Sequence, residues 1–108
     1  MSEKEIYEEE RTIYMIKPEF LIQDLLRAFK KMGLVVELIE GKGSWLLKGS
    51  SRNEKAVVEL VSTYKIIDEL RTLGPIPVSK LLIRLEGSEN FIKAFKHRLE
   101  VELLRCLG

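Results

Sequence analysis

The stretch that decides the fold is residues 80–98, KLLIRLEGSENFIKAFKHR, because its pattern predicts a strand followed directly by a helix. Leu81 to Leu85 is rich in large aliphatic residues, which predicts a buried strand. Gly87 breaks this strand, and the following Ser88 is a favoured residue at a helix N-cap. We therefore expect a strand that leads directly into a helix running from about Ser88 towards Leu107.

The residues before this stretch predict a first strand, a helix and a hairpin. Residues 11–17 are apolar on both faces, which suits a central strand, and a proline ends it. Apolar residues recur at helical spacing through residues 19–32, and Gly33 is a typical helix C-cap. Two short strands, 34–39 and 45–48, flank a Gly-Lys-Gly-Ser turn and should pair as a hairpin.

A long second helix is expected between Ser51 and the Gly-Pro-Ile-Pro segment at residues 74–77. Its predicted buried stripe consists of apolar residues at helical spacing: Val57, Leu60, Val61, Tyr64, Ile67 and Leu70. The element order becomes β-α-β-β-α-β-α. The economical solution is an α+β fold, a ferredoxin-like βαββαβ sandwich with right-handed crossovers and an additional C-terminal helix.

The charged residues are unevenly distributed along the chain. Residues 1–10 hold five Glu and one Lys, and we expect them to form a flexible acidic tail before a single domain at residues 11–108. Without this tail, the 18 basic and 17 acidic residues of the chain become 17 and 12, a net charge of +5. A mildly basic body slightly favours an anionic partner.

The composition also indicates where the protein is located and which cysteine chemistry it can have. The sequence has no apolar run of membrane-spanning length, and its acidic start is unlike a signal peptide, so we expect a cytoplasmic protein without a membrane partner. Cys106 is the only cysteine, which excludes an internal disulfide and a cysteine metal cluster. Side-chain amides are rare while Lys and Glu are abundant, a bias typical of thermophiles.

The sequence offers no catalytic constellation. His97 is the only histidine and lies among basic residues, so it forms no recognisable triad or zinc-binding pattern. The segment Gly41-Lys42-Gly43 is too short for a phosphate-binding P-loop. We therefore expect a protein that is not an enzyme and that holds neither a cofactor nor a metal.

The segment ERTIYMIKPE, residues 10–19, resembles the opening strand of nucleoside diphosphate kinases. The segment FKKMGL, residues 29–34, is similar to the end of their first helix. The resemblance implies that Lys17 binds a nucleotide phosphate. The family's phosphorylated histidine has no counterpart, since His97 does not match its motif. The resemblance therefore implies a nucleotide-binding domain without kinase activity.

The segment LIRLEG, residues 82–87, and the basic residues after it are similar to the last strand and basic turn of small ferredoxin-like ribonuclease P protein subunits. Those proteins bind the catalytic RNA and do no chemistry themselves. The family's Ser-Gly-Thr turn is replaced by residues 89–91 in this chain. The resemblance implies RNA contacts, mainly to phosphates, from a set of four basic residues: Arg84, Lys93, Lys96 and Arg98.

A third interpretation is a homodimeric protein-interaction module, because small domains often bury an exposed sheet edge or face by pairing. Val101, Leu104 and Leu107 on the last helix are the candidate surface. The sequence thus favours a non-catalytic binding or assembly domain. The RNA-binding subunit of a ribonucleoprotein is the leading hypothesis, and the nucleotide-binding domain and the homodimer are its alternatives.

Overall fold

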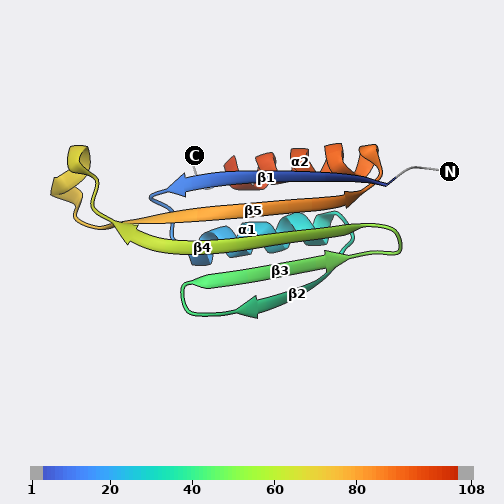
Figure 1. The fold of residues 1–108 in the computed structure, drawn as a ribbon, viewed down its shortest axis with the longest axis horizontal. Helices are drawn as coiled ribbons and strands as arrows, with labels where there is room; N and C mark the ends of the chain where they lie inside the picture. Colours follow the sequence, from blue (N-terminus) through green and yellow to red (C-terminus); the bar gives the residue numbers. More distant parts are fainter. Residues whose placement is uncertain (1–3, 105–108) are drawn as a thin grey trace.

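The protein is an α+β structure in which two helices lie behind one antiparallel sheet (Figure 1). The computed structural model describes residues 4–104. Its elements in chain order are β1 (Glu5–Tyr14), α1 (Pro18–Lys31), β2 (Val35–Glu40), β3 (Ser44–Ser50), β4 (Lys55–Lys65), the 3-10 helix η1 (Asp68–Leu73), β5 (Ile76–Gly87) and α2 (Glu89–Leu104).

The sheet has five strands in the order β1-β5-β4-β3-β2, and every neighbouring pair is antiparallel. Strands β2 to β5 follow one another as neighbours, and α1 carries the chain from β1 at one edge to β2 at the other. The α+β class is confirmed. The ferredoxin-like βαββαβ arrangement is not found, because a helical crossover expected in the middle of the chain is replaced by a fifth strand.

The expected long helix between residues 51 and 73 was wrong. This segment forms β4 and η1 instead. In β4, Ala56, Val58 and Leu60 are fully buried, while the residues between them are more exposed. Burial at every second residue is the period of a strand, and the β-branched residues of the segment favour that conformation.

The expected acidic tail at residues 1–10 was also wrong where the structure describes it. Strand β1 begins at Glu5 rather than at Arg11, and it pairs with β5 from Glu5 opposite Gly87 to Tyr14 opposite Val78. Strand β5 is correspondingly longer than the predicted Leu81–Leu85. An edge strand tolerates glutamates because one of its sides is open to water, where charged side chains remain solvated.

Both helices follow the sequence expectations closely. Helix α1 starts with Pro18 at its first turn, and Gly33 beyond its end has a φ of +75°, the left-handed conformation of a C-terminal cap. At the start of α2, the Ser88 hydroxyl accepts a hydrogen bond from the backbone N–H of Phe91 at 3.1 Å. This contact confirms Ser88 as the N-cap.

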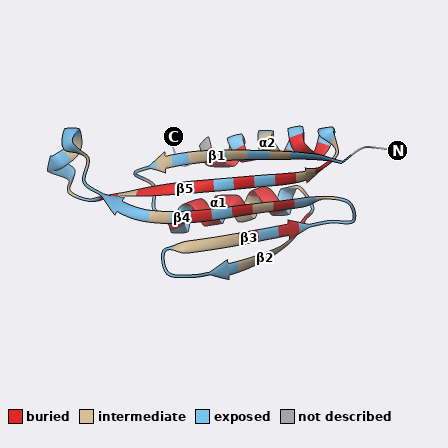
Figure 2. Cartoon of the chain, viewed as in Figure 1, coloured by how far each residue is buried: buried red, intermediate tan, exposed pale blue. Residues whose placement is uncertain are grey.

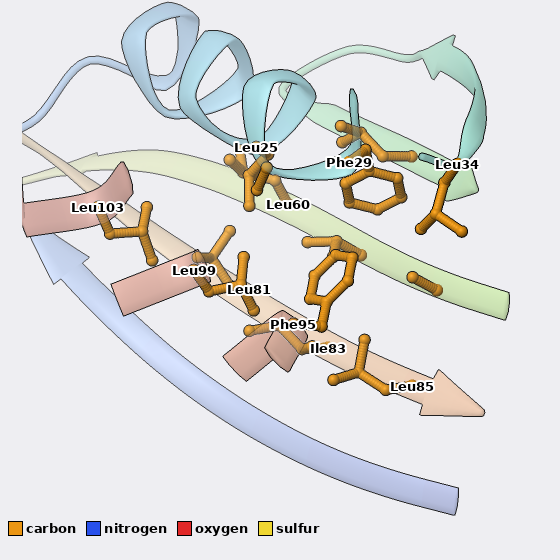
Figure 3. Packing of buried hydrophobic residues seen from close by; sticks show 14 of the residues in the cluster. Leu25, Phe29, Leu34, Leu60, Leu81, Ile83, Leu85, Phe95, Leu99 and Leu103 are labelled. Atoms are coloured by element: carbon orange, nitrogen blue, oxygen red, sulfur yellow. The ribbon is translucent and has the colours of Figure 1, made fainter. Parts of the chain in front are cut away.

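The hydrophobic core fills the space between the helices and one face of the sheet (Figure 3). Phe29 of α1 and Phe95 of α2 meet edge to face, with ring centroids 5.2 Å apart. Below them, β5 contributes Leu81, Ile83 and Leu85, whose side chains alternate with exposed residues along the strand (Figure 2). Within residues 4–104, no helix lies on the opposite face of the sheet.

The molecule is elongated, with extents of 56 × 25 × 20 Å. Strands β4 and β5 continue as a short two-stranded arm beyond both of their neighbours. The pairing of β3 ends where Ser44 lies opposite Val61, and the pairing of β1 ends where Tyr14 lies opposite Val78. Helix η1 caps the tip of this arm (Figure 1). The arm's distal residues include the exposed Tyr64, Ile66 and Leu73.

Substitution of Gly49 tests the closest approach between α1 and the sheet. A Cβ at Gly49 would lie 2.6 Å from Cε2 of Phe29 and closer still to Cδ2, so the ring would have to move. We expect Gly49→Ala to lower the free energy of unfolding by about 1–3 kcal/mol in urea titrations. The neighbouring exposed Ser50→Ala should change it by less than about 0.5 kcal/mol. An unchanged penalty in a Phe29→Leu background would contradict this origin.

Candidate functional site

The four basic residues predicted to contact RNA do not come together. Arg84 lies on the strand face without helices, directly opposite Glu8 of β1 and Val57 of β4. Lys93, Lys96 and Arg98 belong to α2, which packs on the other face of the sheet. The four residues therefore do not form one contiguous basic patch.

Each basic residue of α2 also has a partner within the molecule. Lys93 Nζ lies 3.0 Å from Glu89 Oε1, and Lys96 Nζ lies 4.3 Å from the centre of the Tyr7 ring. Arg98 Nη1 lies 4.0 Å from Glu102 Oε1. Lys96 thus joins α2 to β1, and Arg98 joins a network between the helices. RNA binding by these residues stays a prediction.

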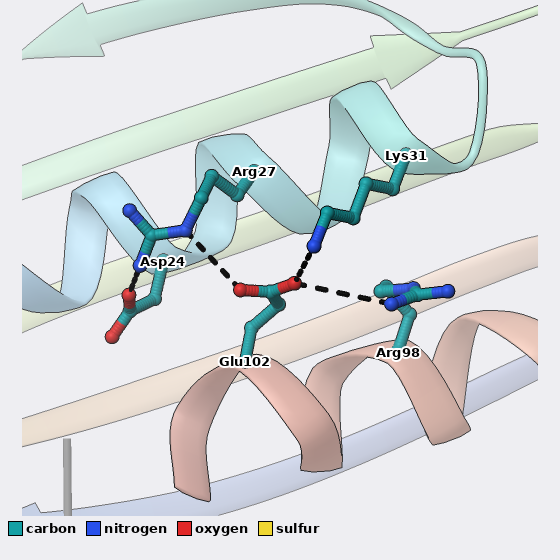
Figure 4. Close-up of polar contacts among 5 residues, drawn as sticks. All are labelled: Asp24, Arg27, Lys31, Arg98 and Glu102. Atoms are coloured by element: carbon teal, nitrogen blue, oxygen red, sulfur yellow. Dashed lines mark hydrogen bonds and ion pairs between the residues drawn. The ribbon is translucent and has the colours of Figure 1, made fainter. Parts of the chain in front are cut away.

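The network around Arg98 joins the two helices (Figure 4). Its centre is Glu102, whose side chain is 1% exposed. The Glu102 carboxylate accepts hydrogen bonds from Arg27 Nε at 3.2 Å and Lys31 Nζ at 2.8 Å, and Arg27 also bonds Asp24. Charge-assisted bonds of this kind offset the cost of burying a carboxylate. We assign this cluster a structural role.

Lys17, the residue expected to bind a nucleotide phosphate, is exposed at the N-cap of α1. It borders a hollow of about 490 Å³ that is lined by Met15, Ile16, Lys17, Phe20, Gln23, Asp24 and Arg27. The second cation of this hollow, Arg27, is already held by Asp24 and Glu102. A single exposed lysine does not define a phosphate site, so nucleotide binding also stays a prediction.

The helix-free face of the sheet, called the open face below, is the most distinctive surface of the described chain. Solvent-exposed aliphatic side chains gather on it: Leu82 of β5 is 42% exposed, Val61 of β4 is 39% exposed, and Ile39 of β2 is 44% exposed. Figure 2 shows buried and exposed residues alternating along β4 and β5. Isolated exposed aliphatic residues are ordinary, whereas a group of them on one face makes that face a candidate interaction surface.

Glu59 lies at the centre of the open face. The strand register places it directly between Leu82 of β5 and Leu46 of β3. Along β4, the residues two positions away on the same face are Val57 and Val61. The Glu59 carboxylate is therefore ringed by four aliphatic side chains. Within residues 4–104 it forms no ion pair.

A hollow of about 440 Å³ lies over this part of the open face. Its lining combines acidic, basic and aliphatic residues of four strands: Glu8, Glu9, Glu10, Leu46, Val57, Glu59, Leu82, Ile83 and Arg84. Among the carboxylates around it, Glu10 pairs with Lys80 at 3.0 Å and Glu9 pairs with Arg11. Within residues 4–104 neither Glu8, which lies opposite Arg84, nor Glu59 forms an ion pair. Of these two carboxylates, Glu59 is the one that four aliphatic side chains surround.

The other surfaces offer less chemistry. No group of three or more potential metal ligands occurs among the residues that the structure describes. In the same part of the chain, no helix is long and apolar enough to cross a membrane. Leu107 and the side chain of Leu104, two of the three candidate dimer contacts on the last helix, lie outside the described residues.

No protein-family model matches this sequence, and no curated protein matches it either. The resemblances to ribonuclease P subunits and nucleoside diphosphate kinases therefore stay predictions.

Sequence reasoning missed the open face because it placed β4 in a helix. The signal was present in residues 56–64, AVVELVSTY, where four of the nine residues are β-branched and a glutamate stands among aliphatic residues. Read with a period of two, Val57, Glu59 and Val61 share one face of a strand.

A polar cluster on the helix side holds β1 against α2. The Tyr7 hydroxyl donates to Glu9 Oε1 at 2.8 Å, and Arg11 bonds both Glu9 and Glu100 of α2. Burial alone would raise the pKa of the Glu9 carboxyl. The hydrogen bonds from Arg11 and Tyr7, with the positive charges of Arg11 and Lys96, outweigh burial and hold that pKa below its ordinary value of 4.5.

This cluster predicts a loss of stability in acid. Because the folded-state pKa of Glu9 is below its unfolded value, its contribution is present above about pH 4.5 and is lost as the pH falls through the folded-state pKa. We expect Glu9→Gln to lower the free energy of unfolding at about pH 7 and to flatten its decline towards about pH 3. Urea titrations across this range measure both effects. A decline as steep as that of the wild type would exclude Glu9 as its source.

Proposed function

We propose that this chain is a non-catalytic protein-binding domain that docks a partner protein on the open face of its sheet. The observation that carries the proposal is the position of Glu59, a carboxylate that forms no ion pair within residues 4–104 and lies at the centre of a ring of aliphatic side chains. A central anchor surrounded by side chains that exclude water is the usual arrangement of an energetic hot spot in a protein interface.

The chemistry of this face specifies what a partner must supply. Covering Glu59 with an apolar surface alone would bury an unpaired charge, which costs several kcal/mol. A partner that presents a Lys or Arg side chain within an apolar surface would match both the carboxylate and the ring around it. The partner is therefore a protein with a basic, apolar docking segment.

A second copy of the chain fits this face poorly. In a two-fold face-to-face contact centred on β4, the middle strand, Glu59 would lie against Glu59 of the other copy. Like charges at such a distance repel, and a low dielectric strengthens the repulsion. RNA fits poorly as well, because the hollow contains the carboxylates of Glu8, Glu10 and Glu59.

Partner capture followed by reconstitution tests this proposal. The chain is used as bait in extracts of the cells that encode it, and each retained protein is purified and its affinity is measured. We expect Glu59→Lys to weaken that affinity at least about tenfold, because the new lysine would face the Lys or Arg side chain of the partner within the aliphatic ring. Leu82→Ser should also weaken it, since it opens the ring to water.

The matched control is Glu69→Lys, the same charge change on the exposed surface of η1. It should leave the affinity unchanged, and circular dichroism should show that all variants are folded. Equal binding by the wild type and Glu59→Lys would contradict the proposal. Retention of RNA that is lost in Lys93→Ala and Lys96→Ala would instead favour the ribonucleoprotein hypothesis, and its affinity should then fall steeply with salt.

A further inference from the structure

Strand β2 is an edge strand whose outer backbone groups can be identified. The turn between β2 and β3 closes with a hydrogen bond from the Gly41 N–H to the Ser44 carbonyl, at 2.8 Å. Hydrogen-bonded and non-hydrogen-bonded pairs alternate along an antiparallel ladder. Val35, Glu37 and Ile39 therefore bond β3, and a second set of β2 residues points its N–H and C=O groups away from the sheet: Val36, Leu38 and Glu40.

The two edges of the sheet differ in their side chains. Strand β1 carries the run Glu8-Glu9-Glu10, whose like charges oppose pairing of two β1 strands. Strand β2 has the sequence VVELIE and no lysine or proline, the residues that commonly block an edge. Val35, at 79% exposure, is the most exposed large hydrophobic residue of the described chain. The edge at β2 is therefore the one suited to accept another strand.

We infer that β2 pairs antiparallel with β2 of a second copy of this chain, which joins two five-stranded sheets into one continuous sheet. The contact is isologous, so one edge satisfies both copies and the assembly closes as a dimer. About six backbone hydrogen bonds would form between Val36, Leu38 and Glu40 and the same residues of the second copy.

The side chains distinguish between two neighbouring registers that keep these hydrogen bonds. With Leu38 opposite Leu38 of the second copy, Glu37 lies opposite Ile39, and the outward-pointing backbone groups face one another. Shifting the partner so that Glu37 faces Glu37 also keeps the hydrogen bonds, but it sets two like charges directly opposite, which is destabilising. In the first register each Glu37 keeps Lys48 of its own copy as its neighbour on β3.

This dimer would leave both open faces accessible. The axis relating the copies runs through the sheet, so the two open faces lie side by side on one surface. Ile39 and Leu46 lie opposite each other, so aliphatic residues extend from Glu59 to the seam. The inference does not rest on the proposed partner protein, because the edge groups of β2 and the open-face ring around Glu59 are different features.

Analytical ultracentrifugation of the purified full chain tests this inference. The wild type should be a dimer that dissociates on dilution, with a measurable dissociation constant. Glu40→Pro removes an outward-pointing N–H without breaking a bond to β3. An edge strand tolerates proline at such a position. It should raise the dissociation constant by about tenfold or more, because two hydrogen bonds per dimer are lost. Glu40→Ala, the matched control, should not.

A pair of charge variants tests the register. Ile39→Glu places a carboxylate opposite Glu37 of the second copy and should weaken the dimer roughly tenfold at low salt. Ile39→Lys makes the same loss of apolar contact but places an ammonium group there, so it should dimerise at least about tenfold more tightly than Ile39→Glu. High salt should reduce the difference between the two variants.

A monomer at every accessible concentration would overturn the inference. So would a dimer whose dissociation constant is the same for the wild type, Glu40→Pro and Ile39→Glu. Unfolding of Glu40→Pro would be seen by circular dichroism, and the two exposed Ile39 variants would then decide the outcome. Ile39 belongs to the open face, whereas Glu40 lies on the helix side of β2, opposite Trp45. Loss of the dimer in Glu40→Pro with partner binding retained would therefore separate the dimer from partner binding.

Discussion

The structure depends on burial from one side only. Both helices pack on the same face of the five-stranded sheet, and the Phe29–Phe95 contact lies at the junction between the helices. Every strand must therefore send alternate side chains to the core, which fixes the register of the long β4–β5 pair. The same constraint leaves the remaining side chains on a face that no element of the described chain covers.

Charged residues also connect the helices to each other and to the sheet. Glu102 is buried between the helices and bonds Arg27 and Lys31, while Arg11 links β1 to α2 through Glu9 and Glu100. Surface ion pairs contribute little to stability, whereas removal of one partner from a buried pair is strongly destabilising because it leaves an unpaired buried charge. Several basic residues that the composition suggested for an anionic partner are therefore paired within the helix layer. Glu59 on the open face forms no ion pair within residues 4–104.

The sequence predicted the helices well and the middle of the chain badly, for physical reasons. Helix α1 has a proline start, a single apolar stripe and a glycine cap, and all three agree. In β4, Val57, Leu60, Val61 and Tyr64 satisfy helical spacing while the segment also alternates with a period of two. The abundance of β-branched residues was the signal that should have decided between the two periods.

Other features depend on contacts that sequence alone does not give. Strand β1 is glutamate-rich and becomes ordered by pairing with β5, which lies far along the chain. The open face is likewise assembled from side chains on all five strands, so its ring around Glu59 exists only once the register is fixed. If two copies join at β2, two such rings face the same way. A partner with two docking segments could then bind both, and avidity would turn a modest affinity into a stable assembly.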